Sequence, residues 1–457
     1  MKKRTTDRNS PGASLTRRSL LKSATAAGAA FSLTDLSRPL AGAAQTASMM
    51  GVPFERRDKV RLGVIGTGGR GLGMLGEWLA VPNLQVTAVC DIDPAAAARA
   101  VKRVEKAGQP APAAYTAGEY DFENLCRRDD VDFIYIATPW DWHAPMAVAA
   151  MKNGKHCGLE VPATITLDEC WQIVNVSEQT RRHCMIMENC CYGQSELMVL
   201  NIVKAGLLGQ LIHGEAAYNH DLRFIVNENR SEGLWRRIPH TKRNGNLYPT
   251  HGLGPVSNYM RVNRGDYFDH LVSMSSPALG LDEYRARHEP KGSAKWKEKY
   301  VCGDMNTSLI KTAQGRTIML QHNITTPRPY DRINLIQGTR GIFRDYPERI
   351  YIESEGKKDE EYESLAKYKA QHEHALWKAA GEMARKNAGH GGMDYIMVYR
   401  VVECFRQGIA PDMDVYDAAL WSAPGPLSEQ SVAQGSMPVK FPDFTRGKWK
   451  EARPVME

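Results

Sequence analysis

The chain has 457 residues, of which 42% are hydrophobic and 24% charged, so it is long enough for two domains with sizeable cores. Its formal net charge is +7, but the first 43 residues hold eight basic and two acidic residues and so carry six of these charges. The remaining chain is almost neutral. This balance excludes the charge pattern expected of a nucleic-acid-binding protein or of one that binds an anionic membrane surface.

Residues 1–43 have the pattern of a secretion signal. A basic start is followed by T-R-R-S-L-L-K at 16–22, a short Ala/Gly-rich apolar segment and an A-x-A cleavage pattern at 41–43. The adjacent Arg17 and Arg18 indicate the twin-arginine route, which exports folded proteins. The apolar segment is too short to span about 30 Å of hydrocarbon, so no membrane anchor is expected. We expect the export machinery as a partner and a periplasmic or secreted location.

The nine cysteines predict neither a disulfide framework nor a metal site. They form no C-x-x-C pair, and the vicinal Cys190 and Cys191 have no Cys/His spacing typical of metal ligands. A large chain with an odd number of cysteines fits folding in a reducing cytoplasm before export.

A glycine-rich motif opens the first predicted domain, residues 58–188. An apolar strand at 60–65 runs into G-x-G-x-x-G at Gly66, Gly68 and Gly71, and a helix at 72–80 follows. Glycine permits a tight turn and close approach to a pyrophosphate, which then lies at the helix N-terminus. In this strand–turn–helix context the motif predicts a dinucleotide-binding Rossmann domain, and the alternative is a structural glycine-rich turn.

Asp91 favours NAD over NADP as the cofactor. It ends the next predicted strand, at 84–90, and lies twenty residues beyond Gly71. Its carboxylate can accept hydrogen bonds from ribose hydroxyls and would repel a 2′-phosphate, and no arginine adjoins it.

Further strands and helices alternate up to residue 188. Strands at 131–137 and 155–160 and helices at 143–154 and 167–180 predict a doubly wound parallel sheet. Because ligands bind beyond the carboxyl ends of such strands, residues 138–143 and 160–162 should lie beside the cofactor.

The pattern changes near Asn189. Shorter β-like runs predict a second, α+β domain over residues 189–435 with a large, mostly antiparallel sheet, followed by a C-terminal tail at 436–457. The apolar periodicity of residues 393–407 predicts a helix that packs back on the first domain. The fold class is therefore α/β, with a Rossmann domain and a second sheet domain.

Three motifs together resemble the glucose-fructose oxidoreductase/inositol dehydrogenase (Gfo/Idh/MocA) family: the strand followed by G-T-G-G-R-G, A-T-P-W-D-W-H at 137–143, and E-V-P at 160–162. Dehydrogenases of that family usually carry E-K-P, with a lysine that assists proton transfer at the hydroxyl being oxidised. This chain has Val161 there, and valine cannot transfer a proton. Ordinary alcohol oxidation by that lysine is therefore not expected.

Further motifs are spread over almost the whole chain after the leader: W-D-W-H, G-L-E-V-P, M-E-N-C-C-Y-G, Y-N-H-D-L-R, L-W-R-R, L-Y-P-T-H-G-L-G-P-V and G-H-G-G-M-D. Together they resemble one branch of this family, glycosyl hydrolase family 109. The resemblance implies an NAD-dependent α-N-acetylgalactosaminidase whose substrate is a small molecule or glycan ending in N-acetylgalactosamine. It also implies a homo-oligomer formed through the sheet face of the second domain.

The resemblance also implies site residues. NAD contacts would come from Gly66, Gly68, Arg70, Gly71, Asp91, Trp140, Asp141, Trp142, His143, Glu160, Val161 and Asn189. The sugar site would be lined by Tyr218, Arg237, Tyr248, Pro249, Thr250, His251 and Tyr330. The catalytic candidates are His251, Tyr192 and Tyr330.

The residues alone leave other roles open. Tyr248–His251 lie in a Gly/Pro-rich stretch expected to be irregular, and a histidine there is as often structural as catalytic. Arg236 and Arg237 could be a solvated pair, Trp140 and Trp142 could serve packing, and Tyr218 could be a sheet aromatic. His390 could cap the following helix.

The export signal and the missing lysine agree with one chemistry. NAD is not supplied outside the cytoplasm, so an exported enzyme must keep its NAD and regenerate it in every cycle. A redox-neutral glycosidase does so by oxidising C3 of the sugar, removing the C2 proton, eliminating the aglycone, adding water and returning the hydride. The alternatives are a periplasmic sugar oxidoreductase that retains NAD(P) and a catalytically silent sugar-binding protein.

Overall fold

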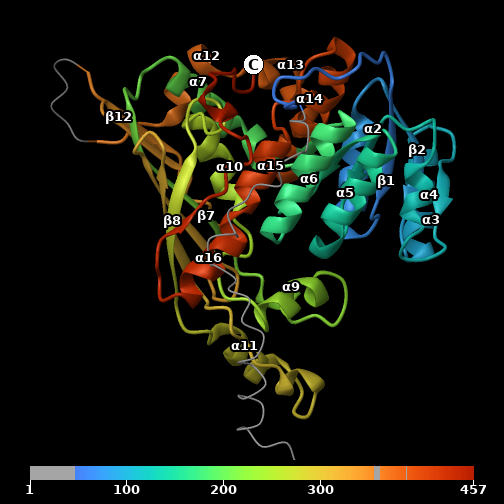
Figure 1. Cartoon of the computed structure of the whole chain (residues 1–457), viewed down its shortest axis with the longest axis horizontal. Coiled ribbons are helices and arrows are strands. Elements are labelled where there is room, and N and C mark those ends of the chain that lie inside the picture. Colours follow the sequence, from blue (N-terminus) through green and yellow to red (C-terminus); the bar gives the residue numbers. More distant parts are fainter. Residues whose placement is uncertain (1–46, 355–360, 388) are drawn as a thin grey trace, which may run out of the picture. The chain divides into compact units, whose positions relative to one another are not determined.

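The computed structural model describes residues 47–354, 361–387 and 389–457, and residues 47–457 form one compact unit (Figure 1). The expected signal at 1–43 lies outside the described residues. The unit contains a six-stranded sheet built from residues 60–186 and an eight-stranded sheet built from residues 211–440.

The first sheet is the predicted Rossmann sheet. All its strands are parallel, in the order β3-β2-β1-β4-β5-β6. The strands are β1 (Val60–Ile65), β2 (Leu84–Cys90), β3 (Ala113–Tyr115), β4 (Phe133–Ile136), β5 (His156–Leu159) and β6 (Cys184–Ile186), and the helices are α2 (Gly69–Ala80), α3 (Pro94–Lys106), α4 (Phe122–Cys126), α5 (His143–Lys152) and α6 (Leu167–Thr180). The predicted parallel sheet is confirmed. Helix α6 begins where expected because Thr166 and Glu169 form a capping box.

The second sheet is mostly antiparallel, as predicted. Its order is β13-β12-β11-β7-β10-β9-β8-β14, and β7 and β10 are its one parallel pair among the described strands. The strands are β7 (Leu211–Asn219), β8 (Phe268–Ser275), β9 (Asn306–Thr312), β10 (Thr317–Asn323), β11 (Leu335–Gly338), β12 (Gly341–Arg344), β13 (Arg349–Ile352) and β14 (Val439–Lys440). Strand β14 pairs with β8, so the segment expected as a tail contributes an edge strand.

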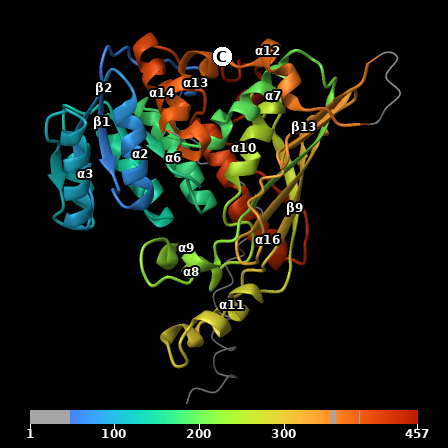
Figure 2. The same ribbon diagram turned by 180° about the vertical axis from the view of Figure 1, so that it is seen from behind.

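Helices of the second half pack on both sheets. Helix α10 packs on β7 and α16 on β8, whereas α14 packs on α2 and β1, which confirms the helix predicted to return to the first domain (Figures 1 and 2). The remaining helices are α7 (Gln194–Lys204), α8 (Arg223–Val226), α9 (Glu232–His240), α10 (Thr250–Tyr259), α11 (Gly280–His288), α12 (Lys369–His372), α13 (Ala375–Asn387), α14 (Met393–Gln407), α15 (Val415–Ser422) and α16 (Pro424–Ala433).

The expectation of irregular backbone at Tyr248–His251 is wrong for its second half. Thr250 and His251 form the first turn of α10, which contains Gly252 and Pro255. The glycine serves close packing: a Cβ on Gly252 would lie 2.3 Å from the backbone nitrogen of Ala217 in β7. The helix therefore approaches the strand more closely than a larger residue would permit, and it carries His251 on a rigid element.

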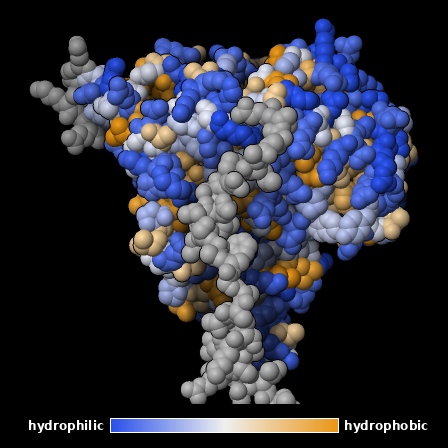
Figure 3. Space-filling model, in the orientation of Figure 1, coloured by the Kyte–Doolittle hydropathy of each residue, from blue (hydrophilic) through white to orange (hydrophobic). Residues whose placement is uncertain are grey.

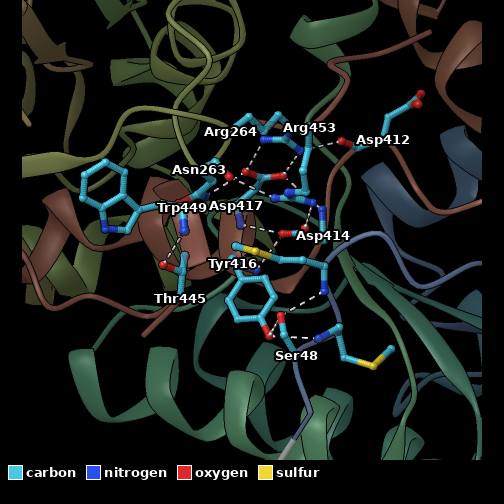
Figure 4. Close-up of polar contacts among 12 residues, drawn as sticks. Ser48, Asn263, Arg264, Asp412, Asp414, Tyr416, Asp417, Thr445, Trp449 and Arg453 are labelled. Atoms are coloured by element: carbon cyan, nitrogen blue, oxygen red, sulfur yellow. Dashed lines mark hydrogen bonds and ion pairs between the residues drawn. The ribbon is translucent and has the colours of Figure 1, made fainter. Parts of the chain in front are cut away.

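A buried polar network joins both ends of the described chain to α15 (Figure 4). Near the start, the Tyr416 hydroxyl lies 3.0 Å from Ser48 Oγ. Near the end, Arg453 donates to Asp414 at 3.1 Å. One turn on, Arg264 donates to both carboxylate oxygens of Asp417 at 2.6 and 2.9 Å. These bonds anchor α15, which contacts both α6 of the Rossmann domain and α10 of the second domain.

The surface seen in Figure 3 is mostly hydrophilic, with apolar residues scattered among polar ones. In the part of the chain that the structure describes, no helix has the length and apolar character needed to cross a membrane. All nine cysteines are free and buried.

Candidate active site

A cavity of about 680 Å³ lies at the carboxyl ends of the Rossmann strands and extends to the second sheet. On one side it is lined by Gly66, Gly68, Arg70 and Asp91, and on the other by Tyr218, Tyr248 and His251. One continuous space therefore joins the predicted dinucleotide cradle to the predicted sugar cluster, at the position where doubly wound sheets bind ligands.

The glycine-rich turn has the shape that a dinucleotide requires. A Cβ on Gly71 would lie 1.8 Å from the carbonyl oxygen of Gly66, so this position accepts only glycine. A Cβ on Gly68 or Gly69 would meet no atom within 4 Å, which leaves open space in front of the first turn of α2. That space and the free N–H groups of the turn fit a pyrophosphate.

Asp91 is oriented by the same turn. One carboxylate oxygen accepts from the backbone N–H of Thr67 at 2.7 Å and from the Thr67 hydroxyl at 3.1 Å, and the other accepts from the Asp93 N–H at 2.9 Å. The carboxylate lines the cavity at the end of β2. Its position therefore fits the predicted contact with ribose hydroxyls.

Arg70 connects the cradle to the second half of the chain. Its Nε donates to Glu160 at 2.8 Å and its terminal nitrogens donate to Asp394 at 2.8 and 3.1 Å. Asn189 donates to the same Asp394 at 2.7 Å, and the Tyr135 hydroxyl donates to Glu160 at 2.6 Å. Burial tends to raise the pKa of Asp394, but the hydrogen bond from His390 and the charge of Arg70 outweigh it and hold that pKa below its usual value.

The sugar side is built around His251 and a buried carboxylate. His251 Nδ1 lies 2.7 Å from Glu188 Oε1, and Glu188 is fully buried. Burial alone would raise the pKa of Glu188, but the charge and hydrogen bond of His251 outweigh it and lower the pKa. The Glu188 carboxylate is therefore ionised and orients the imidazole. Its role was not predicted, because nothing in the sequence places it beside His251, 63 residues away.

Aromatic rings surround this pair. The ring of Tyr218 lies 4.5 Å from that of Tyr248 and 5.3 Å from that of His251, between ring centroids. Burial raises the pKa of both phenols above the usual value. They are therefore protonated at neutral pH and can donate hydrogen bonds to sugar oxygens.

Two further cavity groups were missed by the sequence analysis. His220 follows β7, and its Nδ1 lies 3.3 Å from the Tyr218 hydroxyl. Burial lowers the pKa of His220, and the charge of Arg236 lowers it further. Arg236 lies over the rings of Trp140, Trp235 and Tyr248 at 5.5, 4.7 and 5.1 Å from their centroids.

Some predicted site residues do not reach the cavity lining. Arg237 points away from it and donates to Glu298 and to backbone carbonyls, so the predicted arginine is replaced at the cavity by its neighbour Arg236. Tyr192 is fully buried and its hydroxyl donates to Asp412 at 3.3 Å. Tyr330 is not part of the cavity lining, but its ring centroid lies 4.9 Å from that of His220, which is. The cavity lining also omits Gly71, Asp141, Pro249 and Thr250.

The other predicted residues line the cavity. Trp140, Trp142, His143, Glu160, Val161 and Asn189 all border it beside Arg70 and Asp91. His390 borders it too, and its side chain bonds to Asp394 rather than capping α14, whose N-cap Gly392 has no side-chain cap.

One group of donors could hold a metal ion. Ligand atoms of Glu188, Cys190 and His251 lie within 4.8 Å of one another. Burial raises the pKa of the Cys190 thiol well above its usual value, which disfavours the thiolate that binds metal. The other two possible ligands, Glu188 and His251, are hydrogen-bonded to each other instead.

Comparison with protein families identifies both halves. Residues 192–451 match the C-terminal domain of glycosyl hydrolase 109, and residues 60–188 match the NAD-binding Rossmann fold of an oxidoreductase family. The chain belongs to glycosyl hydrolase family 109. Its first domain is therefore an NAD-binding domain, and the predicted family is confirmed.

Relatives are similar over nearly the whole chain. A glycosyl hydrolase family 109 protein of Solibacter usitatus is 55% identical over 441 residues, 96% of this chain and 99% of its own. An α-N-acetylgalactosaminidase of Shewanella oneidensis is 50% identical over 412 residues, 89% of this chain and 90% of its own.

Solved structures share the fold at lower identity. Levoglucosan dehydrogenase in complex with NADH and L-sorbose is 19% identical, with a TM-score of 0.67 over 85% of this chain and 100% of its own. The complex with NADH alone is 18% identical, with a TM-score of 0.66 over 84% of this chain and 100% of its own.

Proposed function

We propose that this family 109 protein hydrolyses terminal N-acetylgalactosaminides, of α linkage, by a redox-neutral cycle with retained NAD. The observation that carries the proposal is one continuous cavity in which the dinucleotide cradle meets Tyr218, Tyr248 and His251. The relative named α-N-acetylgalactosaminidase supports the substrate class. Val161, which lines this cavity, supports a reaction other than lysine-assisted alcohol oxidation.

Bound NAD would supply a reversible hydride acceptor for C3 of the sugar. Oxidation at C3 would make the neighbouring C2 proton acidic. Gly68, Arg70 and Asp91 would hold it, and the chain's other groups move protons. His251 accepts a proton, and the buried Glu188 carboxylate stabilises the imidazolium that results. This proton exchanges with solvent, and His251 gives a proton back to C2 when water adds, so His251 ends each cycle as it began.

The tyrosines orient the sugar. Because burial keeps Tyr218 and Tyr248 protonated, they donate to sugar oxygens without taking up protons themselves. Tyr218 also contacts His220, so one phenol stands between the two imidazoles. His251 and His220 are thus two separate proton-transfer groups, in a reaction that moves protons at more than one atom.

Hydrolysis in D₂O tests the proposal. Purified protein should cleave p-nitrophenyl N-acetyl-α-galactosaminide without added NAD, place deuterium at C2 of the released sugar and accumulate no NADH. Cleavage that leaves C2 free of deuterium would point to direct displacement at C1. Sugar oxidation that needs a second carbonyl substrate, with no cleavage, would instead favour the oxidoreductase.

We also infer that the protein is loaded with NAD before twin-arginine export. The support is Arg17–Arg18 in the leader together with a chemistry that consumes no NAD. Replacing both arginines with lysine should leave active, NAD-bound protein in the cytoplasm. Efficient secretion of that variant would contradict the inferred export route.

A further inference from the structure

Residues 389–394, here called the clasp, connect the dinucleotide cradle to the C-terminal half of the chain. The clasp consists of the short helix η5 (Gly389–Gly392) and the first two residues of α14, and it lies against α2. None of the sequence-predicted site residues belongs to it. Its His390 nevertheless lines the same cavity as Arg70 and Asp91.

Asp394 is the centre of the clasp's contacts. It is 3% exposed and accepts from Arg70 at 2.8 and 3.1 Å, from Asn189 at 2.7 Å and from His390 at 2.7 Å. These partners come from the glycine-rich turn, from the junction between the two halves and from the clasp itself. One buried carboxylate thus holds three segments that border the cofactor space.

A second contact fixes the clasp two turns further along α2. The backbone N–H of Gly389 donates to the carboxylate of Glu77. A Cβ on Gly389 would lie 2.5 Å from Glu77 Oε1 and 3.0 Å from Asp394 Oδ2, so a larger residue there would force both carboxylates to move. The clasp is therefore held to α2 at both ends.

The backbone between these contacts is left-handed. His390, Gly391 and Gly392 have φ angles of +46°, +71° and +96°. Glycine adopts this conformation freely, but histidine does so at a cost. The side chain thus placed has Nδ1 on Asp394 and lies 3.3 Å from an Arg70 nitrogen, beside the first turn of α2 where a pyrophosphate fits.

We propose that the clasp is part of the cofactor site and sets the rate at which the dinucleotide leaves. His390 and Arg70 together face the diphosphate, and Asp394 holds both in place. Departure of the cofactor requires the clasp to separate from α2, which breaks the buried ion pair of Arg70 and Asp394. This inference rests on the proposed function only in taking NAD as the ligand.

The test is the rate at which NAD is lost from purified protein during exchange against an excess of a fluorescent NAD analogue. Asp394→Asn keeps the shape of the side chain but removes its charge. We expect NAD loss to be at least tenfold faster than in the wild type, because the variant lacks the buried ion pair that must break before the cofactor leaves. Hydrolysis by this variant should then depend on added NAD, whereas wild-type hydrolysis should not.

Asp132→Asn is the matched control. Asp132 accepts a bidentate pair from Arg61 at 2.7 and 2.9 Å and is also nearly buried, but it lies at the other end of β4 from the cavity. Its loss should leave the rate of NAD exchange within twofold of the wild type. Equal acceleration in both variants would overturn the proposal, since it would indicate general loosening of the domain.

A second variant covers a failure of Asp394→Asn to fold. His390→Asn tolerates the left-handed backbone and leaves the Arg70–Asp394 pair intact. It should release NAD several-fold faster than the wild type, and an unchanged rate in this folded variant would overturn the proposal. Wild-type protein that cleaves the glycoside without holding NAD would refute the proposed function instead.

Discussion

Replacing Glu188 with glutamine should slow hydrolysis by about 100- to 1000-fold while leaving the fold and NAD content intact. The hydrogen bond at 2.7 Å between His251 Nδ1 and Glu188 Oε1 survives in form, because the glutamine oxygen can still accept. The substitution removes only the negative charge of the Glu188 side chain. The variant therefore isolates the electrostatic support that the carboxylate gives to a protonated His251.

The magnitude follows from the burial of the pair. The side chains of His251 and Glu188 are 14% and 0% exposed, so solvent screens their interaction little. Two unit charges about 4 Å apart attract by about 4 kcal/mol at an effective dielectric of about 20. Each 1.36 kcal/mol corresponds to a factor of about ten in rate, which gives about three powers of ten as the upper value.

The assay is kcat for release of p-nitrophenol by NAD-loaded enzyme, with bound NAD and the thermal midpoint measured on the same samples. The double variant Glu188→Gln/His251→Ala should be no slower than His251→Ala alone, because the carboxylate acts through the imidazole. A Glu188→Gln enzyme with wild-type kcat, beside an inactive His251→Ala enzyme, would refute this reasoning.

Three other outcomes are expected. Asp91→Ala should lower the NAD content of purified protein, measured after denaturation, and equal content in variant and wild type would exclude the ribose contact. His220→Gln should reduce kcat by about tenfold or more with unchanged NAD content, because it removes the second cavity imidazole; a change in NAD content alone would contradict this. Burial lowers the pKa of His183 and of His240 to about 4, from 6.5. Because both histidines are neutral in the folded state, each lowers the free energy of unfolding by up to about 3 kcal/mol as the pH falls from 6.5 towards 4. His240→Leu should therefore flatten the fall of the thermal midpoint over this pH range. An unaltered slope would refute the assignment.

The Rossmann half was predictable because its signals are local. Strands 60–65 and 84–90 appear as β1 and β2 with the predicted bounds, since buried parallel strands have mostly apolar sequences. Gly71 could be placed for the same reason, as the turn's geometry leaves room for no side chain.

The sugar half was less predictable because its contacts depend on helix phase and on distant segments. Adjacent residues on a helix point about 100° apart, so Arg236 and Arg237 could not be told apart without knowing which face of α9 meets the cavity. The glycines near His251 predict an irregular loop, whereas in the structure Gly252 permits a helix to lie close to β7. Glu188 and Asp394 act on partners far away in sequence, and no spacing rule connects them.

The hydrogen bonds that connect α15 to Ser48 and Arg453, near the two ends of the described chain, have a consequence for biosynthesis. Ser48 emerges from the ribosome early, yet its partner Tyr416 is made hundreds of residues later, and Arg453 closes on Asp414 only after that. A nascent chain stalled before residue 453 therefore lacks the Arg453 partner of Asp414, even where its Rossmann domain has already folded. The last residues to be made therefore complete the packing around α15, and loss of residues 453–457 should yield a protein that cellular proteases remove.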